Sequence, residues 1–178
     1  HQDYDHIGSA LDVLKRYDVG VVYDNGVEHT SKTYENLMTY LAEEDVEYTV
    51  VRDGDFISSP WSGVSIEVLS PSEDLIYKGK KADVNENSIV LKVTYGETTY
   101  LLTGDAETEA EEYLLSTYAD IDADILKAGH HGSSSSSTYD FLRAVTPDVI
   151  LISCGADNDY GHPHIEPLEN FAKFTTAD

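Results

Sequence analysis

Residues that commonly bind metals are concentrated in the first six positions of the chain. The sequence begins His1-Gln2-Asp3-Tyr4-Asp5-His6, which has the pattern H-x-D-x-D-H. These spacings fit neither one face of a helix nor one face of a strand. A loop that leaves a strand and enters a helix can turn all four side chains toward one point. Imidazole and carboxylate groups together suit a divalent transition-metal ion.

Three apolar runs further along the chain lead to residues of the same types. The segment 101–105 (LLTGD) ends in Asp105, the segment 125–131 (ILKAGHH) ends in His130 and His131, and the segment 149–153 (VILIS) is followed by His162. Strands buried in a sheet deliver polar residues to one edge of that sheet in this way. This repeated layout, after the H-x-D-x-D-H start, predicts a metal site at the ends of the strands.

The ordered set of motifs resembles the metallo-β-lactamase superfamily. The set consists of H-x-D-x-D-H-x-G, N-x-x-S-I-V-L, L-L-T-G-D, H-H-G-S and Y-G-H-P, and it runs from His1 to about His164. It is most similar to the competence-protein branch, which comprises the hydrolase-like domain of ComEC/Rec2 DNA-uptake proteins and its free-standing relatives. Each motif is short, so the resemblance depends on their order and on how much of the chain they cover.

The resemblance implies an α/β (α+β) fold, the four-layer αββα sandwich of the superfamily, as a single domain over residues 1–178. Superfamily members place strands before the histidine-rich loop, so we expect these N-terminal strands to be missing from the chain. A hairpin over residues 88–102 disfavours the alternative, a doubly wound parallel sheet. The patterns predict helices over 6–17, 33–44, 107–117, 139–145 and 165–173, and strands over 19–23, 46–51, 64–69, 88–93, 98–102, 123–128 and 149–153.

The resemblance also implies a centre for two divalent ions, zinc or manganese. By analogy, the first ion would be bound by His1 and Asp3, the second by Asp5, His6 and one of His130 and His131, and Asp105 would bridge the two. If the strand continues through Gly129, neighbouring side chains point in opposite directions, so only one histidine of the pair would bind the ion. The other could hold a substrate oxygen or orient a ligand.

Two departures from the superfamily pattern weaken the first ion site. Asp3 replaces the second histidine of the more familiar H-x-H-x-D-H loop, which shifts the preference from zinc toward manganese. The histidine that often precedes the bridging aspartate is also absent, because no histidine lies between His29 and His130. The amide oxygen of Asn87 could replace it, and Asn85 or Ser88 are alternatives. The first site is therefore expected to be weak, partly occupied or empty.

The candidate catalytic residues are Asp5, Asp105 and His162, and the candidate substrate-binding residues are His162, Ser133 and Asn87. His162 would bind phosphate or protonate the leaving group; the alternative is a turn histidine before the following helix. The run Ser133–Ser137 is either a flexible linker or a loop whose hydroxyl and N–H groups cradle phosphate.

Three further residues are predicted to lie outside the site. Lys127, in a predicted strand, is expected to point away from the ions. His29, in a polar turn, is expected on the surface. Cys154, the one cysteine, is expected to be a buried small residue, and a lone cysteine excludes an intrachain disulfide.

The charge of the chain is extreme, with 34 acidic residues, 11 lysines and arginines and a formal net charge of −23. Acidic residues spread along the sequence favour a protein from a high-salt environment, and we expect a halophilic archaeal source. The same charge argues against ordinary nucleic-acid binding, which depends on lysine and arginine, although high salt weakens that dependence. No segment approaches the roughly 18 apolar residues of a membrane helix.

These observations predict a metal-dependent hydrolase, most directly a phosphodiesterase or nuclease that acts on DNA through a metal-activated hydroxide. One alternative is a hydrolase of small esters, lactones or phosphoesters on the same fold. The other is a non-catalytic binding domain of a DNA-uptake assembly. The resemblance further implies a larger membrane or surface protein and an extracellular or cell-surface location.

Overall fold

The computed structural model describes residues 1–174. Its helices are α1 (Tyr4–Ile7), α2 (Ala10–Arg16), α3 (Lys32–Glu43), α4 (Thr108–Thr117), the 3₁₀ turn η1 (Gly129–Gly132), α5 (Tyr139–Val145) and α6 (Ile165–Phe174). Its strands are β1 (Val21–Asp24), β2 (Glu47–Val50), β3 (Val64–Ser70), β4 (Tyr77–Lys78), β5 (Lys81–Ala82), β6 (Val90–Tyr95), β7 (Thr98–Leu102), β8 (Ile125–Lys127) and β9 (Val149–Leu151).

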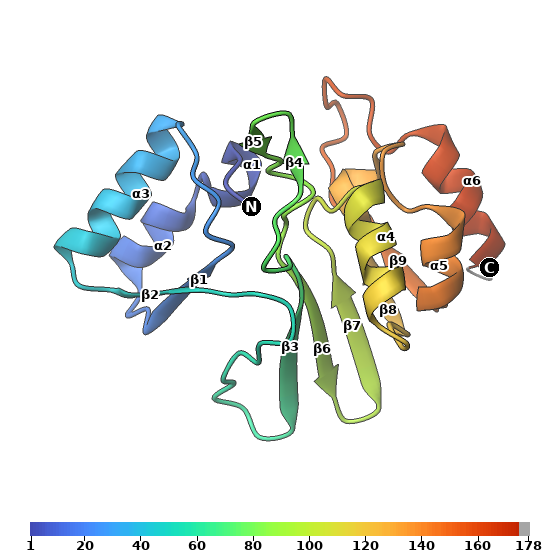
Figure 1. Ribbon diagram of the computed structural model, residues 1–178, viewed down its shortest axis with the longest axis horizontal. Coiled ribbons are helices and arrows are strands. Elements are labelled where there is room, and N and C mark those ends of the chain that lie inside the picture. The colour runs from blue at the N-terminus through green and yellow to red at the C-terminus, as the bar shows by residue number, and fades with distance from the viewer. Residues whose placement is uncertain (175–178) are drawn as a thin grey trace.

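Two sheets lie between two groups of helices. Strands β1 and β2 form a parallel pair, and five strands form a second sheet in the order β3-β6-β7-β8-β9. Figure 1 shows α2 and α3 outside the two-stranded sheet and α4, α5 and α6 outside the five-stranded sheet. This mixed arrangement of helices and sheets confirms the predicted fold class.

The five-stranded sheet brings the ends of several strands together. Strands β3, β6 and β7 pair antiparallel, and the predicted hairpin turns between Tyr95 and Thr98. Strands β7, β8 and β9 pair in parallel. The carboxyl ends of parallel strands meet at one edge of a sheet, so the segments that follow Leu102, Lys127 and Leu151 start side by side.

The main apolar core lies in the part of the chain that contains the five-stranded sheet. Its buried members come from the sheet, from α4, α5 and α6 and from the connecting segments: Leu69, Val90, Leu101, Ala106, Ala110, Leu114, Ile121, Ala123, Leu126, Ala128, Phe141, Leu142, Val145 and Phe171. Burial of apolar surface on this scale stabilises a fold strongly. The core therefore supports the sheet edge at which the candidate ligands emerge.

Three details differ from the sequence-based prediction. The helix expected over 6–17 is divided between α1 and α2, since Gly8 has low helix propensity and Ser9 occupies the N-cap of a new helix. The polar loop expected over 72–87 contains the short hairpin β4–β5. Strand β8 ends at Lys127, before the tight turn η1. Within residues 1–174, no helix is both long enough and apolar enough to cross a membrane.

Candidate metal centre

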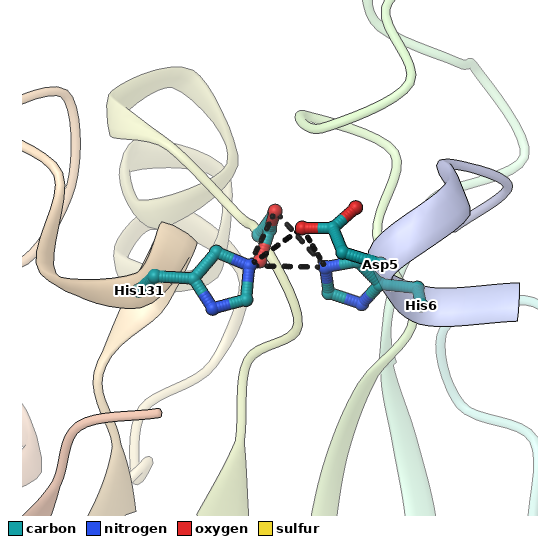
Figure 2. A group of neighbouring side chains, drawn as sticks. Asp5, His6 and His131 are labelled. Atoms are coloured by element: carbon teal, nitrogen blue, oxygen red, sulfur yellow. Dashed lines mark hydrogen bonds and ion pairs between the residues drawn. The ribbon is translucent and has the colours of Figure 1, made fainter. Parts of the chain in front are cut away.

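Four side chains from distant parts of the sequence converge on one point. Asp5, His6, Asp105 and His131 each offer a ligand atom, and these four atoms all lie within 4.8 Å of one another. Figure 2 shows Asp5 and His6 approaching from one side and His131 from the other. Ligand atoms of one ion, at about 2.1 Å from it, lie about 3.0–3.5 Å apart. Three separations in the structure fall in this range: His6 Nε2 is 3.1 Å and His131 Nε2 is 3.4 Å from Asp105 Oδ2, and His131 Nε2 is 3.2 Å from Asp5 Oδ2. The separation of His6 Nε2 from Asp5 Oδ2 is wider, at 3.8 Å.

The first turn of the chain explains how neighbouring residues reach this point together. Asp3 has an extended backbone at the N-cap of α1, and its carbonyl accepts hydrogen bonds from the N–H groups of His6 and Ile7. This tight turn aims Asp5 and His6 at the cluster, whereas Tyr4 is 75% exposed. The expected entry from a loop into a helix is present, and of the four residues spaced i, i+2, i+4 and i+5 it brings Asp5 and His6 into the group of four ligand atoms.

His1 lies against the same aspartate, Asp105. Its side chain is completely buried, and its Nε2 is 3.1 Å from Asp105 Oδ2. Asp3 lies beside it, with Oδ2 3.6 Å from His1 Nδ1. Two buried atoms here, His1 Nε2 and Asp105 Oδ1, have no hydrogen-bond partner. Buried polar atoms without partners are costly, and a bound cation would satisfy both, so these residues fit divalent ions.

Asp105 is held in the ionised form that a carboxylate metal ligand requires. Burial would raise the pKa of Asp105, but the imidazoles of His1 and His6, each with Nε2 3.1 Å from Asp105 Oδ2, hold that pKa far below the usual aspartate range. Its backbone N–H donates to Ser88 Oγ at 3.0 Å. Gly104 just before it has φ +56°, and a Cβ there would meet Ser88 Cβ at 3.0 Å, so glycine permits this close approach.

His130 and His131 both face the centre, contrary to the expected alternation of a continuing strand. The strand has ended, and both residues have left-handed backbones, with φ of 42° and 55°. His131 Nδ1 donates to the Ser153 carbonyl at 2.6 Å, which leaves Nε2 toward the cluster. His130 Nδ1 lies 2.8 Å from Glu107 Oε1, and its Nε2 is 3.9 Å from Asp105 Oδ2. His131 is therefore the better placed ligand, and His130 lies beside the centre on a carboxylate support.

His162 closes another side of the centre. Its ring centroid is 5.5 Å from that of His130 and 6.4 Å from that of His131. Burial and the neighbouring histidines His164, His130 and His131 lower the pKa of His162. Its N–H and carbonyl bond to the side chain of Asn158, which fixes the loop that carries it. His164, which precedes α6, accepts from Ser134 N at 2.9 Å and so supports the adjacent serine loop.

The structure does not bring Asn87 into the cluster. Its side-chain oxygen accepts from Ile76 N, and its side-chain nitrogen donates to the carbonyls of Ile76 and Asp83. It therefore fixes the loop before β6, with its amide oxygen and both of its N–H groups engaged by the backbone of that loop. The substrate-binding role of Asn87 stays a prediction, and the contacts seen here are those of a buried amide that satisfies the backbone of its own loop.

The serine run does not form a backbone cradle for phosphate. All five of its N–H groups already donate within the protein: Ser133 N to the His130 carbonyl, Ser134 N to His164, Ser135 N to Ser133 Oγ, Ser136 N to the Ser133 carbonyl and Ser137 N to Glu111. The hydroxyl of Ser133 lies 2.9 Å from that of Ser135. The run is thus a compact, internally bonded loop, neither a flexible linker nor an anion-binding nest.

Four residues close to the centre have positions or partners that the sequence did not indicate. Lys127 Nζ is 3.9 Å from Asp105 Oδ1 and donates to the Gly104 carbonyl at 2.7 Å, so it points toward the centre. Burial lowers the pKa of Lys127. His29 Nε2 is 3.5 Å from Asp3 Oδ1. Cys154 is exposed beside His131 and His162, and Glu107 supports His130. Of these four residues, only Lys127 could have been predicted from the sequence. It lies in the segment L-K-A-G-H-H, at the end of a strand, and the residues that follow strand ends form the site.

Comparison with known proteins supports one family. A family model described as "Metallo-beta-lactamase superfamily" matches residues 1–156. The chain is 35% identical to ComE operon protein 3 of Bacillus subtilis (strain 168) over 170 residues, which are 95% of the chain and 21% of that protein. It is 34% identical to Recombination protein 2 of Haemophilus influenzae (strain ATCC 51907 / DSM 11121 / KW20 / Rd) over 178 residues, which are 99% of the chain and 20% of that protein. The chain thus spans about a fifth of the length of these relatives.

A solved structure agrees on the fold. The metallo-β-lactamase fold protein YhfI from Bacillus subtilis superposes with a TM-score of 0.54 at 10% identity, over 99% of this chain and 70% of that one. At this identity the likeness shows the fold alone. The fold is typical of hydrolytic metalloenzymes, and the group formed by Asp5, His6, Asp105 and His131 could hold an ion. The chain therefore belongs to the metallo-β-lactamase superfamily, in the ComEC-like group that its motifs resemble.

Proposed function

We propose that the chain is a dinuclear metal-dependent phosphodiesterase that cleaves DNA, with single strands as its preferred form. Support comes from the converging ligands and from similarity to a competence-related family. Bound divalent ions would lower the pKa of a water molecule and neutralise the charge on phosphate oxygens. Manganese suits the aspartate oxygens of the ligand set, including Asp3 in place of a histidine, better than zinc.

The observation that favours a nucleic-acid substrate is the pair of exposed tyrosines beside the ligands. Asp5, Asp105, His131 and His162 line a cavity of about 430 Å³ together with Tyr4 and Tyr160. Tyr4 is 75% and Tyr160 is 78% exposed, so both rings are open to solvent at the mouth of the candidate site. Stacking of a base on an aromatic ring contributes about 1–3 kcal/mol and needs no particular base sequence.

The side chains of this protein would divide the remaining tasks. Asp5 and Asp105 would hold ions, and ionised Asp105 would lie between them. Since its pKa is lowered, His162 is neutral near pH 7, and this favours hydrogen-bond donation to a phosphate oxygen over protonation of the leaving group. Glu107 would hold His130 in position through Nδ1.

The strongly acidic surface makes salt an essential variable. A net charge of −23 repels DNA at low ionic strength, and molar salt screens this repulsion to within about 3 Å. Lys127 places a positive charge next to Asp105. The positive charge of Lys78 is instead balanced by its ion pairs with Asp83 and Glu107. We therefore propose that activity requires high salt, in keeping with the halophilic source that the composition favours.

The test is cleavage of single-stranded DNA by the purified chain with Mn²⁺ in molar salt. We expect Asp105→Asn to lower kcat/KM by roughly 10²–10³-fold or more, because it removes the charge that the ions share. Asp159→Asn, which removes an exposed carboxylate near Tyr160, is the matched control and should leave activity unchanged. Cleavage that survives Asp105→Asn would contradict the metal mechanism.

A second variant separates DNA from a small substrate. Tyr160→Ala should raise KM for single-stranded DNA by roughly 10-fold, as expected for a lost stacking contact, and should leave hydrolysis of bis(p-nitrophenyl) phosphate unchanged. The acidic surface favours the alternative, a hydrolase of small esters, lactones or phosphoesters. Hydrolysis of such compounds with no cleavage of DNA at any salt concentration would support that alternative. Ion binding with neither activity would favour the non-catalytic binding domain of a DNA-uptake assembly.

The similarity to ComE operon protein 3 and Recombination protein 2 also suggests a setting. We propose that the chain acts during DNA uptake at the cell surface, as part of a larger membrane or surface protein. Localisation of the full-length protein with an antibody to the chain, on intact and permeabilised cells, tests this placement.

A further inference from the structure

Another cavity lies beside the candidate metal centre, between the loop that follows β1 and the hairpin β4–β5. We call it the hairpin cavity. Its volume is about 630 Å³, and the residues that line it come from the segments 26–30 and 75–84. Cavities that bind small ligands in proteins measure about 300–1,000 Å³. The hairpin cavity is therefore large enough to take part of a substrate.

Two contacts place the hairpin cavity next to the centre. His29 lines it, and His29 Nε2 lies 3.5 Å from Oδ1 of Asp3, which lines the cavity that holds the candidate ligands. On the hairpin, Lys78 Nζ is 3.3 Å from Glu107 Oε2. The other oxygen of that carboxylate is 2.8 Å from His130 Nδ1. The two cavities therefore adjoin, and a substrate in the form of a chain can extend from one into the other.

The wall of the hairpin cavity differs in charge from that of the centre. It contains Lys81 and one carboxylate, that of Glu28, whereas the cavity at the centre is lined by three aspartates and no lysine. Lys78, opposite Lys81 in the hairpin, is paired with Asp83 at 2.9 Å. Within residues 1–174, the ammonium group of Lys81 forms no ion pair. In a chain with a net charge of −23, this leaves a cationic group open to an anionic ligand such as a phosphate.

The same wall carries an uncovered aromatic ring. Tyr77 lies on β4, and its partner across the hairpin is the small residue Ala82. The side chain of Tyr77 is 59% exposed and lines the cavity. Proteins bind single-stranded DNA by combining cationic groups that contact the backbone with aromatic rings on which bases stack. The hairpin cavity contains one group of each kind.

We propose that the hairpin cavity binds single-stranded DNA beyond the phosphate that is cleaved, with a base stacked on Tyr77 and a phosphate against Lys81. This inference rests on the proposed function, because it assumes the same substrate. The strand would run from Tyr4 and Tyr160 at the mouth of the centre, past His29, to the hairpin. A small phosphoester bound at the centre would not reach it.

The experiment compares the binding of a long and a short oligonucleotide. Thymidine oligomers with phosphorothioate linkages keep the charge of DNA and resist cleavage, so wild-type protein loaded with Mn²⁺ in molar salt is used. Fluorescence anisotropy gives the Kd of a dodecamer and of a dinucleotide. We expect the dodecamer to bind at least roughly 10-fold more tightly. Tyr77→Ala should raise the Kd of the dodecamer by roughly 10-fold and leave that of the dinucleotide unchanged. Tyr95→Ala, which removes a 63% exposed ring at the end of β6, is the matched control.

Charge variants test the phosphate contact in both directions. Lys81→Gln should raise the Kd of the dodecamer by about 3-fold, as expected for one exposed contact between opposite charges. Glu28→Gln, which removes the carboxylate from the wall, should lower that Kd by about 2-fold. Lys80→Gln is the matched control, because Lys80 is an exposed neighbour on the same hairpin that does not line the cavity.

Photo-crosslinking locates the bound strand directly. A dodecamer that carries 5-iododeoxyuridine is irradiated with the protein, and mass spectrometry identifies the crosslinked peptide. We expect the peptide that contains Tyr77. Trp61, which is 68% exposed and does not line the cavity, reports random contacts, and a crosslink at Trp61 alone would contradict the proposal.

The outcomes separate this inference from the proposed function. Circular dichroism verifies that each variant is folded. Equal Kd values for wild type, Tyr77→Ala and Lys81→Gln would overturn the inference even if the centre cleaves DNA. A wild-type protein that binds the dodecamer no more tightly than the dinucleotide would overturn it as well. A selective loss of dodecamer binding in Tyr77→Ala, in a protein that cleaves no DNA, would support the inference while the proposed nuclease function fails.

Discussion

The two lobes of the molecule differ in how they are held together. The N-terminal lobe, residues 1–51, contains four buried apolar side chains: Val27, Leu37, Leu41 and Val51. The C-terminal lobe, residues 64–174, contains the whole apolar core cluster. Neither α1 nor α2 buries a residue, whereas α4 and α5 each bury three. Figure 1 shows α2, α3, β1 and β2 of the N-terminal lobe to the left of β3, which is the edge strand of the sheet in the C-terminal lobe.

The candidate metal centre lies where these lobes meet. Asp5 and His6 come from the N-terminal lobe, and Asp105 and His131 come from the C-terminal lobe. A bound ion would therefore connect a lobe with little core of its own to one that is well packed. Metal binding and folding of the N-terminal lobe should be coupled, because the ligands come together only in the folded state.

The largest expected effect comes from removing divalent ions. If two ions are each present at 100 times their dissociation constants, chelation with EDTA should lower the free energy of unfolding by about 5 kcal/mol. Amide hydrogen exchange should rise mainly in residues 1–51, since that lobe depends most on the connection. Mass spectrometry of exchanged peptides, with and without EDTA, measures both lobes in one experiment.

Two controls sharpen this result. Added Mn²⁺ should restore the lost protection, and Asp105→Asn should show no response to EDTA. An equal rise of exchange in both lobes would contradict the idea that the ions support one lobe more than the other.

Core substitutions should show the same asymmetry at a somewhat smaller scale. Leu114 is completely buried in the C-terminal core, and Leu37 is 6% exposed and lines a largely apolar cavity of about 490 Å³. Leu114→Ala should cost about 4–5 kcal/mol and Leu37→Ala about 2 kcal/mol, because a side chain beside an existing cavity has fewer contacts to lose. Urea denaturation of metal-loaded protein measures both. Equal costs would mean that the lobes are packed equally well.

The residues of the centre could be predicted from the sequence where strand ends and motifs coincide. Asp105 and His131 follow β7 and β8, and parallel pairing brings these two strand ends to one edge. Asp5 and His6 needed only the tight turn of α1. These positions depend on local geometry and on the sheet, and both leave a periodic trace in the sequence.

No sequence pattern of this kind indicated where the side chains of His29 and Lys127 lie. His29 reaches Asp3 from the loop after β1, in which the Val27 N–H donates to buried Asn25 Oδ1. Lys127, in a predicted strand, was expected to point away from the ions, but β8 ends at that residue and its ammonium group donates to the Gly104 carbonyl. Asn87 differs in the opposite way. It belongs to a motif, but its side chain forms hydrogen bonds with the backbone of its own loop. Tertiary hydrogen bonds decided all three positions, and these are not encoded in local spacing.

The smallest of the expected effects concerns a buried charge in the C-terminal lobe. Glu111 is 2% exposed, and its carboxylate accepts from the N–H groups of Ser137 and Thr138. Burial raises the pKa of Glu111 to about 7 from an ordinary value of 4.5. Between these two values the unfolded chain releases a proton that the folded protein keeps. The stability that Glu111 contributes is therefore fully present below about pH 4.5 and is lost as the pH rises through about 7.

The free energy of unfolding should accordingly fall by about 2–3 kcal/mol between pH 5 and pH 8 from this group. Burial also raises the pKa of Glu86 and Asp24, so the contribution of Glu111 is measured as a difference between variants. Glu111→Gln should remove this part of the pH dependence, and Glu112→Gln, its exposed neighbour, should leave it unchanged. If the Glu111→Gln and wild-type curves stay parallel from pH 5 to pH 8, the buried carboxylate does not titrate in this range. In that case Glu111, which binds the serine loop, would contribute nothing to the pH dependence of the free energy of unfolding of the C-terminal lobe.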